Sequence, residues 1–242
     1  MKVFNFFIDN FPSFKQLLLL FPISILWSLF SLYLAGICKQ KWKWKTGYTR
    51  KLFHFLIFIS AYFYQRYAGI SAVFILGWSV TIVLIYAWIQ NASNLFYEAI
   101  AREKDAPYRT KYIVFSYLAT FLGGVLSNVF YGSYAIVGYV VTGIADAIAE
   151  PIGTRYGKHQ YAVFSFDVKK KSYRSIEGSM AVFISSFIII IVFQGISDFN
   201  VQSALLAFGI AMLCTLTEAF SPSGFDNFIL QIVAAGLAFY FF

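Results

Sequence analysis

The chain has 242 residues, of which 60% are hydrophobic and 12% are charged, and its formal net charge is +8. Soluble domains are about 45–50% apolar and about 25% charged, and a domain of this length has too little interior to bury so much apolar surface. The composition therefore excludes a soluble globular protein, a disordered chain and a secreted disulfide scaffold. The two cysteines, Cys38 and Cys214, lie in or beside apolar runs, which indicates packing residues and no disulfide or zinc site.

Apolar runs of roughly the length that crosses a bilayer recur along the chain, and a spanning helix needs about 20 such residues. The runs lack the strict alternation of barrel strands, so we expect helices, which satisfy their own backbone hydrogen bonds in lipid. The predicted fold class is all-α: a polytopic transmembrane helix bundle of about eight spans in a single integral membrane domain, 1–242. The spans are expected near residues 17–37, 52–66, 69–90, 112–128, 132–150, 179–197, 201–220 and 226–242. A turn over 127–132 separates the fourth span from the fifth.

Basic residues mark one side of this predicted bundle. Sixteen of the 19 lysines and arginines lie in the first, third and fifth loops, and alternation puts these loops on the same side. The positive-inside rule makes that side cytoplasmic and places both termini on the non-cytoplasmic side. Because the cations are clustered between apolar spans, we expect them beside anionic head groups or phosphate substrates, with no nucleic acid as partner. We expect the first span to be retained, since no charged segment with a cleavage site precedes it.

Two carboxylates end the fifth predicted span. Asp146 and Glu150 are four residues apart, which puts both on one face of a helix, and small residues surround them. Two carboxylates this close repel each other unless a cation or a basic residue lies between them. Mg²⁺ prefers hard oxygen ligands and also holds substrate phosphates, so it suits such a pair. The alternative is an ordinary helix end in which the pair contacts Arg155 or Lys158.

A basic turn that contains two glycines follows these carboxylates. A Walker loop has four residues between its glycines and Ser or Thr after its lysine. Here three residues separate Gly153 from Gly157, and His159 follows Lys158, so the segment is no Walker loop. Arg155, Gly157 and Lys158 are still candidate phosphate-binding residues, because cations on a flexible backbone suit phosphate. The alternative is a plain basic turn.

The second predicted span begins with a basic group that contains a histidine. Arg50 and His54 are four residues apart, and Lys51 lies beside them in the sequence. Cations next to a histidine at a membrane surface suit a grip on phosphate. The alternative is a histidine that only packs in the helix.

Three more carboxylates fall at the same predicted face. Glu177 opens the sixth span after Ser175, a candidate helix cap, and Glu218 ends the seventh. Asp226 and Asn227 begin the eighth span, where the alternative is that Asp226 only caps the helix. No charged residue falls near the middle of a span, so the pattern favours a cytoplasmic-face site for a phosphorylated, metal-bound partner over an ion path through the membrane.

Four segments carry most of these candidates, in this order: Arg50-Lys-Leu-Phe-His54, the block from Ala145 to Tyr161, Arg174-Ser-Ile-Glu-Gly-Ser179 and the block from Thr217 to Asn227. Together they resemble the polyprenol kinase family, which includes phytol, farnesol and dolichol kinases and the CTP-dependent diacylglycerol kinases. The resemblance covers about residues 45–235, and its specific part is the block with Asp146 and Lys158, followed by Glu-Gly-Ser. In one departure, Ala145 precedes Asp146, where the family usually has glycine.

The resemblance implies transfer of the γ-phosphoryl group of a nucleotide to the hydroxyl of an isoprenoid alcohol such as phytol, farnesol or dolichol, or of diacylglycerol. CTP is the favoured donor and ATP the alternative, with Mg²⁺ as cofactor. The catalytic candidates are Asp146, Glu150, Glu177 and His54, of which Asp146 and Glu150 are also the metal candidates. The nucleotide- and phosphate-binding candidates are Arg50, Lys51, Arg155, Gly157, Lys158 and Arg174. Further candidates are Glu218, Asp226 and Asn227.

Two other functions stay open on the sequence. A phosphatidate cytidylyltransferase-like enzyme would release pyrophosphate from CTP, whereas a kinase releases CDP. A membrane transporter is expected to show inverted repeats with broken helices, and the sequence has no internal repeat. The expected partners are the lipid alcohol, the nucleotide and the bilayer, and an oligomer is compatible with the sequence. We expect an integral multi-pass membrane protein whose active site faces the cytoplasm.

Overall fold

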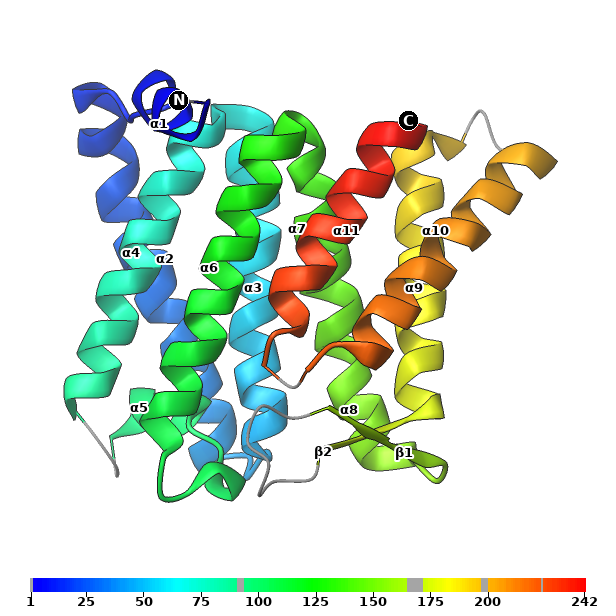
Figure 1. The fold of residues 1–242 in the computed structure, drawn as a ribbon. Helices are drawn as coiled ribbons and strands as arrows, with labels where there is room; N and C mark the ends of the chain where they lie inside the picture. The colour runs from blue at the N-terminus through cyan, green and yellow to red at the C-terminus, as the bar shows by residue number, and fades with distance from the viewer. Residues whose placement is uncertain (1, 91–93, 165–171, 197–199, 223) are drawn as a thin grey trace. The chain divides into compact units, whose positions relative to one another are not determined.

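The chain folds almost wholly into helices in the computed structural model, which describes residues 2–90, 94–164, 172–196, 200–222 and 224–242 (Figure 1). The predicted all-α class is confirmed, and the described residues add one antiparallel pair of short strands that the sequence analysis did not predict. Contacts divide the chain into two compact units, Met1–Val114 and Phe115–Phe242. The single domain over 1–242 stays a prediction.

The first unit is built around one long helix. This helix, α2 (Phe14–Gln40), packs against α3 (Thr46–Ala68), α4 (Ile70–Gln90) and the short α5 (Leu95–Ile100). A capping box starts α2: the Ser13 hydroxyl accepts a hydrogen bond from the Gln16 N–H, and the Gln16 side chain accepts one from the Ser13 N–H. The unit also contains α1 (Lys2–Asp9), η1 (Glu103–Asp105) and the first residues of α6 (Arg109–Tyr131).

The second unit holds the rest of α6 and the later helices. α9 (Ile176–Gln194) packs against α8 (Ala147–Tyr156) and α10 (Val201–Phe220), and α11 (Asp226–Phe241) packs against α7 (Ala135–Val141) and α10. A Cβ at Gly138 would lie 2.5 Å from the carbonyl oxygen of Gln231, so glycine is what lets α7 and α11 approach so closely. The shorter elements of this unit are η2 (Gly132–Tyr134), η3 (Thr142–Asp146), β1 (Gln160–Val163) and β2 (Ser172–Ser175).

The turn predicted over 127–132 lies at the C-terminal edge of that range. α6 continues as a helix through Tyr131, and the chain reverses at Gly132, whose φ is 55°. This backbone conformation favours glycine, because a Cβ would clash with the backbone. α7 then runs back along α6 (Figure 1). The helix extends beyond the predicted boundary because the residues before Gly132 are compatible with helical geometry.

Each of the eight predicted spans overlaps a helix of the described residues, although residue 197 at the end of the sixth span lies outside them. By length and apolar composition, five helical segments among these residues are able to cross a membrane: α2, α4, α9, α10 and the run from α6 to α8, Arg109–Tyr156. α11 is apolar but has only 16 residues. The count of eight spans and the sides of the termini stay predictions. Lys169, Lys170 and Lys171, which contribute to the charge argument, lie outside the described residues.

Candidate functional site

A π-helical turn positions the first of the two predicted carboxylates. Thr142–Asp146 forms this turn between α7 and α8, and π-turns inside helices occur frequently at functional sites. Asp146 is only 3% exposed, whereas Glu150 is half-buried on α8. Asp146 already has helical dihedral angles and α8 runs on through Glu150, so the predicted spacing of one helical turn between the two is present in the backbone.

Pro151 lies inside α8, directly after Glu150. A proline inside a helix has no N–H to donate, and its ring crowds the carbonyl four residues earlier, which here belongs to Ala147. The π-turn thus ends at Asp146, and Pro151 follows Glu150. A segment of this kind exposes backbone groups that a regular helix would use internally.

A buried arginine joins three separate elements of the second unit. Arg174 in β2 pairs with Glu218 at the end of α10, with 2.5 Å between Nη1 and Oε1, and with Asp226 at the start of α11, with 3.1 Å between Nη2 and Oδ2. Its Nη2 also donates to the carbonyl of Ser221, at 3.3 Å. The Arg174 and Glu218 side chains are 13% and 8% exposed. We predicted Arg174 as a phosphate ligand, and the structure shows a guanidinium engaged by the protein's own carboxylates.

Electrostatics link this cluster to Asp146. Burial lowers the pKa of Arg174, but the negative charges of Asp226, Glu218 and Asp146 outweigh burial, so the pKa is raised above its ordinary value. Asp146 therefore lies close enough to act on Arg174. Direct contacts thus bring together three of the predicted residues, from β2, α10 and α11, and Asp146 of η3 acts on Arg174 electrostatically.

Glu177 has a defined contact with the basic turn after α8. Its carboxylate accepts hydrogen bonds from the backbone N–H of Lys158, at 3.1 Å, and of His159, at 3.3 Å. The His159 ring also meets it, with 2.9 Å between Nδ1 and Oε1. Ser175 caps α9, as predicted, by accepting from the N–H of Gly178 at 3.1 Å. Glu177 therefore holds the turn that carries Lys158.

Close packing around Ser175 explains the two glycines of this turn. A Cβ at Gly157 would lie 2.2 Å from the carbonyl oxygen of Gly153 and 2.8 Å from Ser175 Oγ. A Cβ at Gly153 would lie 2.9 Å from the same hydroxyl. The absence of a Cβ at both glycines thus lets the end of α8 pack closely against the start of α9. Arg155 and Lys158 are exposed beside them, with the Arg155 guanidinium 5.3 Å from the centre of the Tyr156 ring.

The remaining predicted residues occupy other positions. Arg50, Lys51 and His54 lie on α3 in the first unit, where Lys51 is buried and the His54 ring lies 4.4 Å from that of Phe58. Asp226 does not cap α11, because the N-cap is Phe225 and Asp226 is the first helical residue.

Asn227 is buried at the start of α11, next to Asp226. Its side-chain Nδ2 donates to the Thr120 hydroxyl on α6, with 3.0 Å between the two atoms. This hydrogen bond joins α11 to α6. It also turns the amide nitrogen of the predicted site residue toward α6.

The donor set around Asp146 agrees with the way that proteins hold Mg²⁺. Among the described residues, no three His, Cys, Asp or Glu side chains are close enough to hold a metal ion by themselves. Mg²⁺ is usually held by one or two carboxylates together with water and substrate phosphates. Asp146 and Glu150, one helical turn apart, fit that smaller set, while Glu218 and Asp226 are engaged by Arg174.

A segment of 106 residues in this chain is 31% identical to a phytol kinase from Synechocystis sp.. The segment covers 43% of this chain and 43% of that protein, so the chain matches less than half the length of its relative. No protein-family profile matches the chain, and no solved structure matches it. The match supports a relationship with phytol kinase-like proteins of the polyprenol kinase type.

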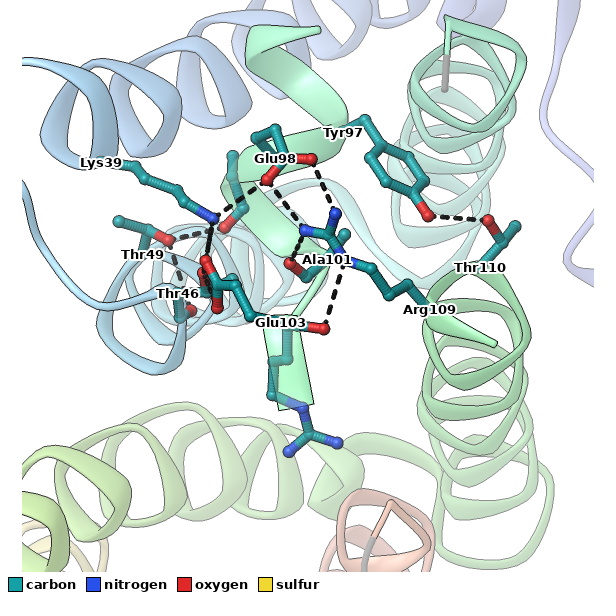
Figure 2. A network of polar contacts seen from close by, with 11 residues as sticks. Lys39, Thr46, Thr49, Tyr97, Glu98, Ala101, Glu103, Arg109 and Thr110 are labelled. Atoms are coloured by element: carbon teal, nitrogen blue, oxygen red, sulfur yellow. Dashed lines mark hydrogen bonds and ion pairs between the residues drawn. The ribbon is translucent and has the colours of Figure 1, made fainter. Parts of the chain in front are cut away.

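A second polar cluster, none of whose residues was predicted from the sequence, lies in the first unit. Lys39, Glu98, Glu103 and Arg109 meet there through ion pairs (Figure 2). A signal was present, since three of the chain's 11 acidic residues lie between positions 98 and 105, inside an otherwise basic loop. Acidic residues placed among lysines and arginines indicate internal ion pairs.

Proposed function

We propose that this protein is a membrane lipid-alcohol kinase. It transfers the γ-phosphoryl group of a nucleotide, CTP in preference to ATP, to an isoprenoid alcohol such as phytol, farnesol or dolichol, or to diacylglycerol. The observation that carries the proposal is the buried Asp146 in a π-turn, within electrostatic reach of the Arg174, Glu218 and Asp226 cluster. The partial match with a phytol kinase supports the choice of a lipid alcohol as acceptor.

Phosphoryl transfer depends mainly on positioning and on neutralising the charge of the transferred group. A bound Mg²⁺, held by Asp146 and Glu150, would supply charge neutralisation on the β- and γ-phosphates. Arg155 and Lys158 are exposed on the turn after α8 and contact the phosphates from there. Arg50, Lys51 and His54 on α3, in the first unit, stay phosphate-binding candidates on the sequence pattern alone. The side chains proposed to bind and orient the nucleotide phosphates are Arg50, Lys51, His54, Arg155 and Lys158.

The alcohol oxygen attacks the γ-phosphorus, the bond from that phosphorus to the bridging oxygen breaks, and the nucleoside diphosphate leaves. The proton of the alcohol passes to a carboxylate. Glu218 and Asp226 are the candidates for this acceptor, because Arg174, on which Asp146 also acts electrostatically, fixes the positions of both. Glu177 orients the turn with Lys158. We propose that this site faces the cytoplasm, as the distribution of lysines and arginines favours.

The direct test uses the purified full chain in detergent with lipid, Mg²⁺, CTP labelled on its γ-phosphate, and phytol, farnesol, dolichol or diacylglycerol as acceptor. We expect a labelled lipid monophosphate and CDP. In a parallel reaction with phosphatidate as acceptor, release of labelled pyrophosphate together with formation of a CDP-lipid would indicate the cytidylyltransferase instead. Solute flux into liposomes without nucleotide would indicate a transporter.

Two matched variants connect the activity to the site. Asp146→Asn removes one negative charge at the proposed metal position and is expected to abolish product formation. Asp9→Asn makes the same chemical change at an exposed residue of α1 and is expected to leave activity at the wild-type level. Unchanged turnover in Asp146→Asn, with wild-type protein active, would show that this residue is no part of the site.

A further inference from the structure

The ends of α2, α3 and α6 meet around α5 in a cluster of charged side chains (Figure 2). Lys39 near the end of α2 is central to it. Its Nζ lies 3.2 Å from Glu98 Oε2, 2.6 Å from Glu103 Oε1 and 2.6 Å from Thr46 Oγ1. The cluster is part of the first unit, and none of its members was predicted as a site residue.

Arg109 and Glu98 form its fixed inner pair. Two parallel hydrogen bonds of 2.8 Å each join the guanidinium to the two carboxylate oxygens, the geometry in which arginine binds a carboxylate most strongly. The guanidinium also donates to the carbonyls of Ala101 and Arg102, and it lies 5.3 Å from the centre of the Tyr97 ring. These contacts hold Glu98 in one orientation.

Glu103 is bound differently from Glu98. Its side chain is 67% exposed, whereas the side chains of Lys39 and Arg109 are each 18% exposed. The Thr46 hydroxyl lies 2.8 Å from one Glu103 oxygen and 2.9 Å from the other, and Lys39 meets the first of these. Glu103 is thus an exposed anion seated on partly buried donors.

The charges of the cluster indicate which kind of ligand could take the place of the Glu103 carboxylate. Lys39 and Arg109 supply two positive charges, of which Glu98 balances one and Glu103 the other. Without Glu103 the position keeps an ammonium, a hydroxyl and one uncompensated positive charge. Those are the groups that bind the oxygens of a phosphate. The pKa of Glu103 is consistent with a strong preference for an anion: burial raises it, but the hydrogen bonds from Lys39 and Thr46 lower it to about 2.

The segment between α2 and α3, next to the cluster, favours a phosphate carried by a membrane lipid. Lys41, Lys43 and Lys45 are exposed between α2 and α3, and Trp42 and Trp44 between them are 60% and 39% exposed. Alternating cations and tryptophans at the end of an apolar helix are typical of chain that lies among lipid head groups. Basic segments beside a spanning helix attract anionic lipids.

We propose that Lys39 and Thr46 form a binding site for the phosphate group of an anionic membrane lipid, and that Glu103 occupies this site as an internal competitor. A lipid phosphate binds by displacing the Glu103 carboxylate from the ammonium and the hydroxyl, while Glu98 and Arg109 stay in place. The site lies in the first unit, contains none of the residues proposed for nucleotide binding, and does not depend on the proposed kinase activity.

The test measures binding of a fluorescent short-chain phosphatidate to the full chain in neutral detergent, by energy transfer from tryptophan. Phosphatidylcholine with the same label and chains is the lipid control. We expect phosphatidate to bind more tightly than phosphatidylcholine, and Glu103→Gln to tighten phosphatidate binding by about two- to fivefold, the range of a partly exposed ion pair. Lys39→Gln and Thr46→Val are expected to weaken it.

Lys41→Gln is the matched control, because it removes the same charge from an exposed lysine two residues away. An equal loss in Lys39→Gln and Lys41→Gln would overturn the proposal and leave only surface attraction. Unchanged phosphatidate binding in Glu103→Gln would overturn it as well, and this exposed substitution leaves the inner pair intact.

Competition by inorganic phosphate or pyrophosphate distinguishes a lipid ligand from a soluble one. If this competition strengthens in Glu103→Gln, it supports the phosphate site and assigns the site to a soluble phosphate. Competition that stays weak assigns it to the lipid.

Discussion

Arg174 in β2 and Glu218 at the end of α10 form a buried ion pair across 44 residues of sequence, with 2.5 Å between Nη1 and Oε1. Asp226 completes the contact from the start of α11, at 3.1 Å. A single guanidinium thereby ties the strand pair to the turn between the last two helices. Loss of one partner leaves a buried charge without compensation, which is far more costly than loss of an exposed pair.

Arg174→Gln is expected to destabilise the protein by about 3–5 kcal/mol, the usual effect of breaking a buried ion pair on one side. Thermal unfolding in detergent measures the loss. The double variant with Glu218→Gln is expected to recover part of it, because the two sites interact directly. Arg155→Gln, at an exposed arginine, is the control and should stay close to wild type. Equal small effects of Arg174→Gln and Arg155→Gln would contradict the assigned role.

Gly157→Ala is expected to destabilise the protein by about 1–3 kcal/mol, because the added methyl group meets the carbonyl of Gly153 and the Ser175 side chain in a tightly packed contact. Gly209→Ala is the matched control: nothing lies within 4 Å of its Cβ position, on α10. That change should leave stability unchanged or raise it by up to about 1 kcal/mol, since alanine favours a helix. Thermal unfolding of the two variants side by side decides the point.

Glu177→Gln is expected to raise the KM for the nucleotide by about three- to tenfold with a smaller change in kcat, because weaker hydrogen bonds to the Lys158 and His159 N–H groups loosen the turn. Steady-state kinetics with the acceptor alcohol at saturation gives both constants. His159→Ala, which removes the ring contact and keeps the two backbone bonds, should have the weaker effect. A loss of kcat at constant KM would instead indicate that Glu177 acts in the chemical step.

The polar cluster of the first unit is expected to make stability depend on acid pH. Hydrogen bonding to Arg109 lowers the pKa of Glu98, and the pKa of Glu103 falls from 4.5 to about 2, where the Lys39 and Thr46 hydrogen bonds outweigh burial. Carboxylates with lowered pKa stabilise the folded state above their ordinary pKa and lose that effect as pH falls through the lowered value.

Acid titration of the unfolding temperature tests this expectation between pH 4.5 and about 2. Wild type should exceed Glu103→Gln in stability above pH 4.5, and the difference should shrink as pH falls toward 2. A difference that grows in acid would contradict the assignment, because it would require a raised pKa for Glu103.

Local sequence features predicted the helices well. Runs of apolar residues gave the approximate positions of α2, α4, α9 and α10, and Ser175 was recognised as a cap because capping depends on neighbours three residues away. The end of α6 was missed by a few residues, since the sequence before Gly132 suits either a helix or a turn.

Features that depend on distant residues were not predictable in the same way. The spacing of Asp146 and Glu150 was readable, but the π-turn that carries Asp146 has no local sequence signal. Arg174 was a phosphate-binding candidate through the family resemblance, and its burial depends on Glu218 and Asp226, which come from later helices. Glu103 and Lys39 are likewise 64 residues apart.

The contacts of Glu177 and the pairing of β1 with β2 couple two parts of the candidate site. The Glu177 carboxylate binds the N–H groups of Lys158 and His159, and β1 and β2 pair just beyond them, so both ends of the intervening chain are fastened to each other. Lys158 and Arg174, 16 residues apart in the sequence, are therefore both tied to the same small strand pair, and a substitution that separates β1 from β2 is expected to disturb the basic turn and the buried ion pairs together.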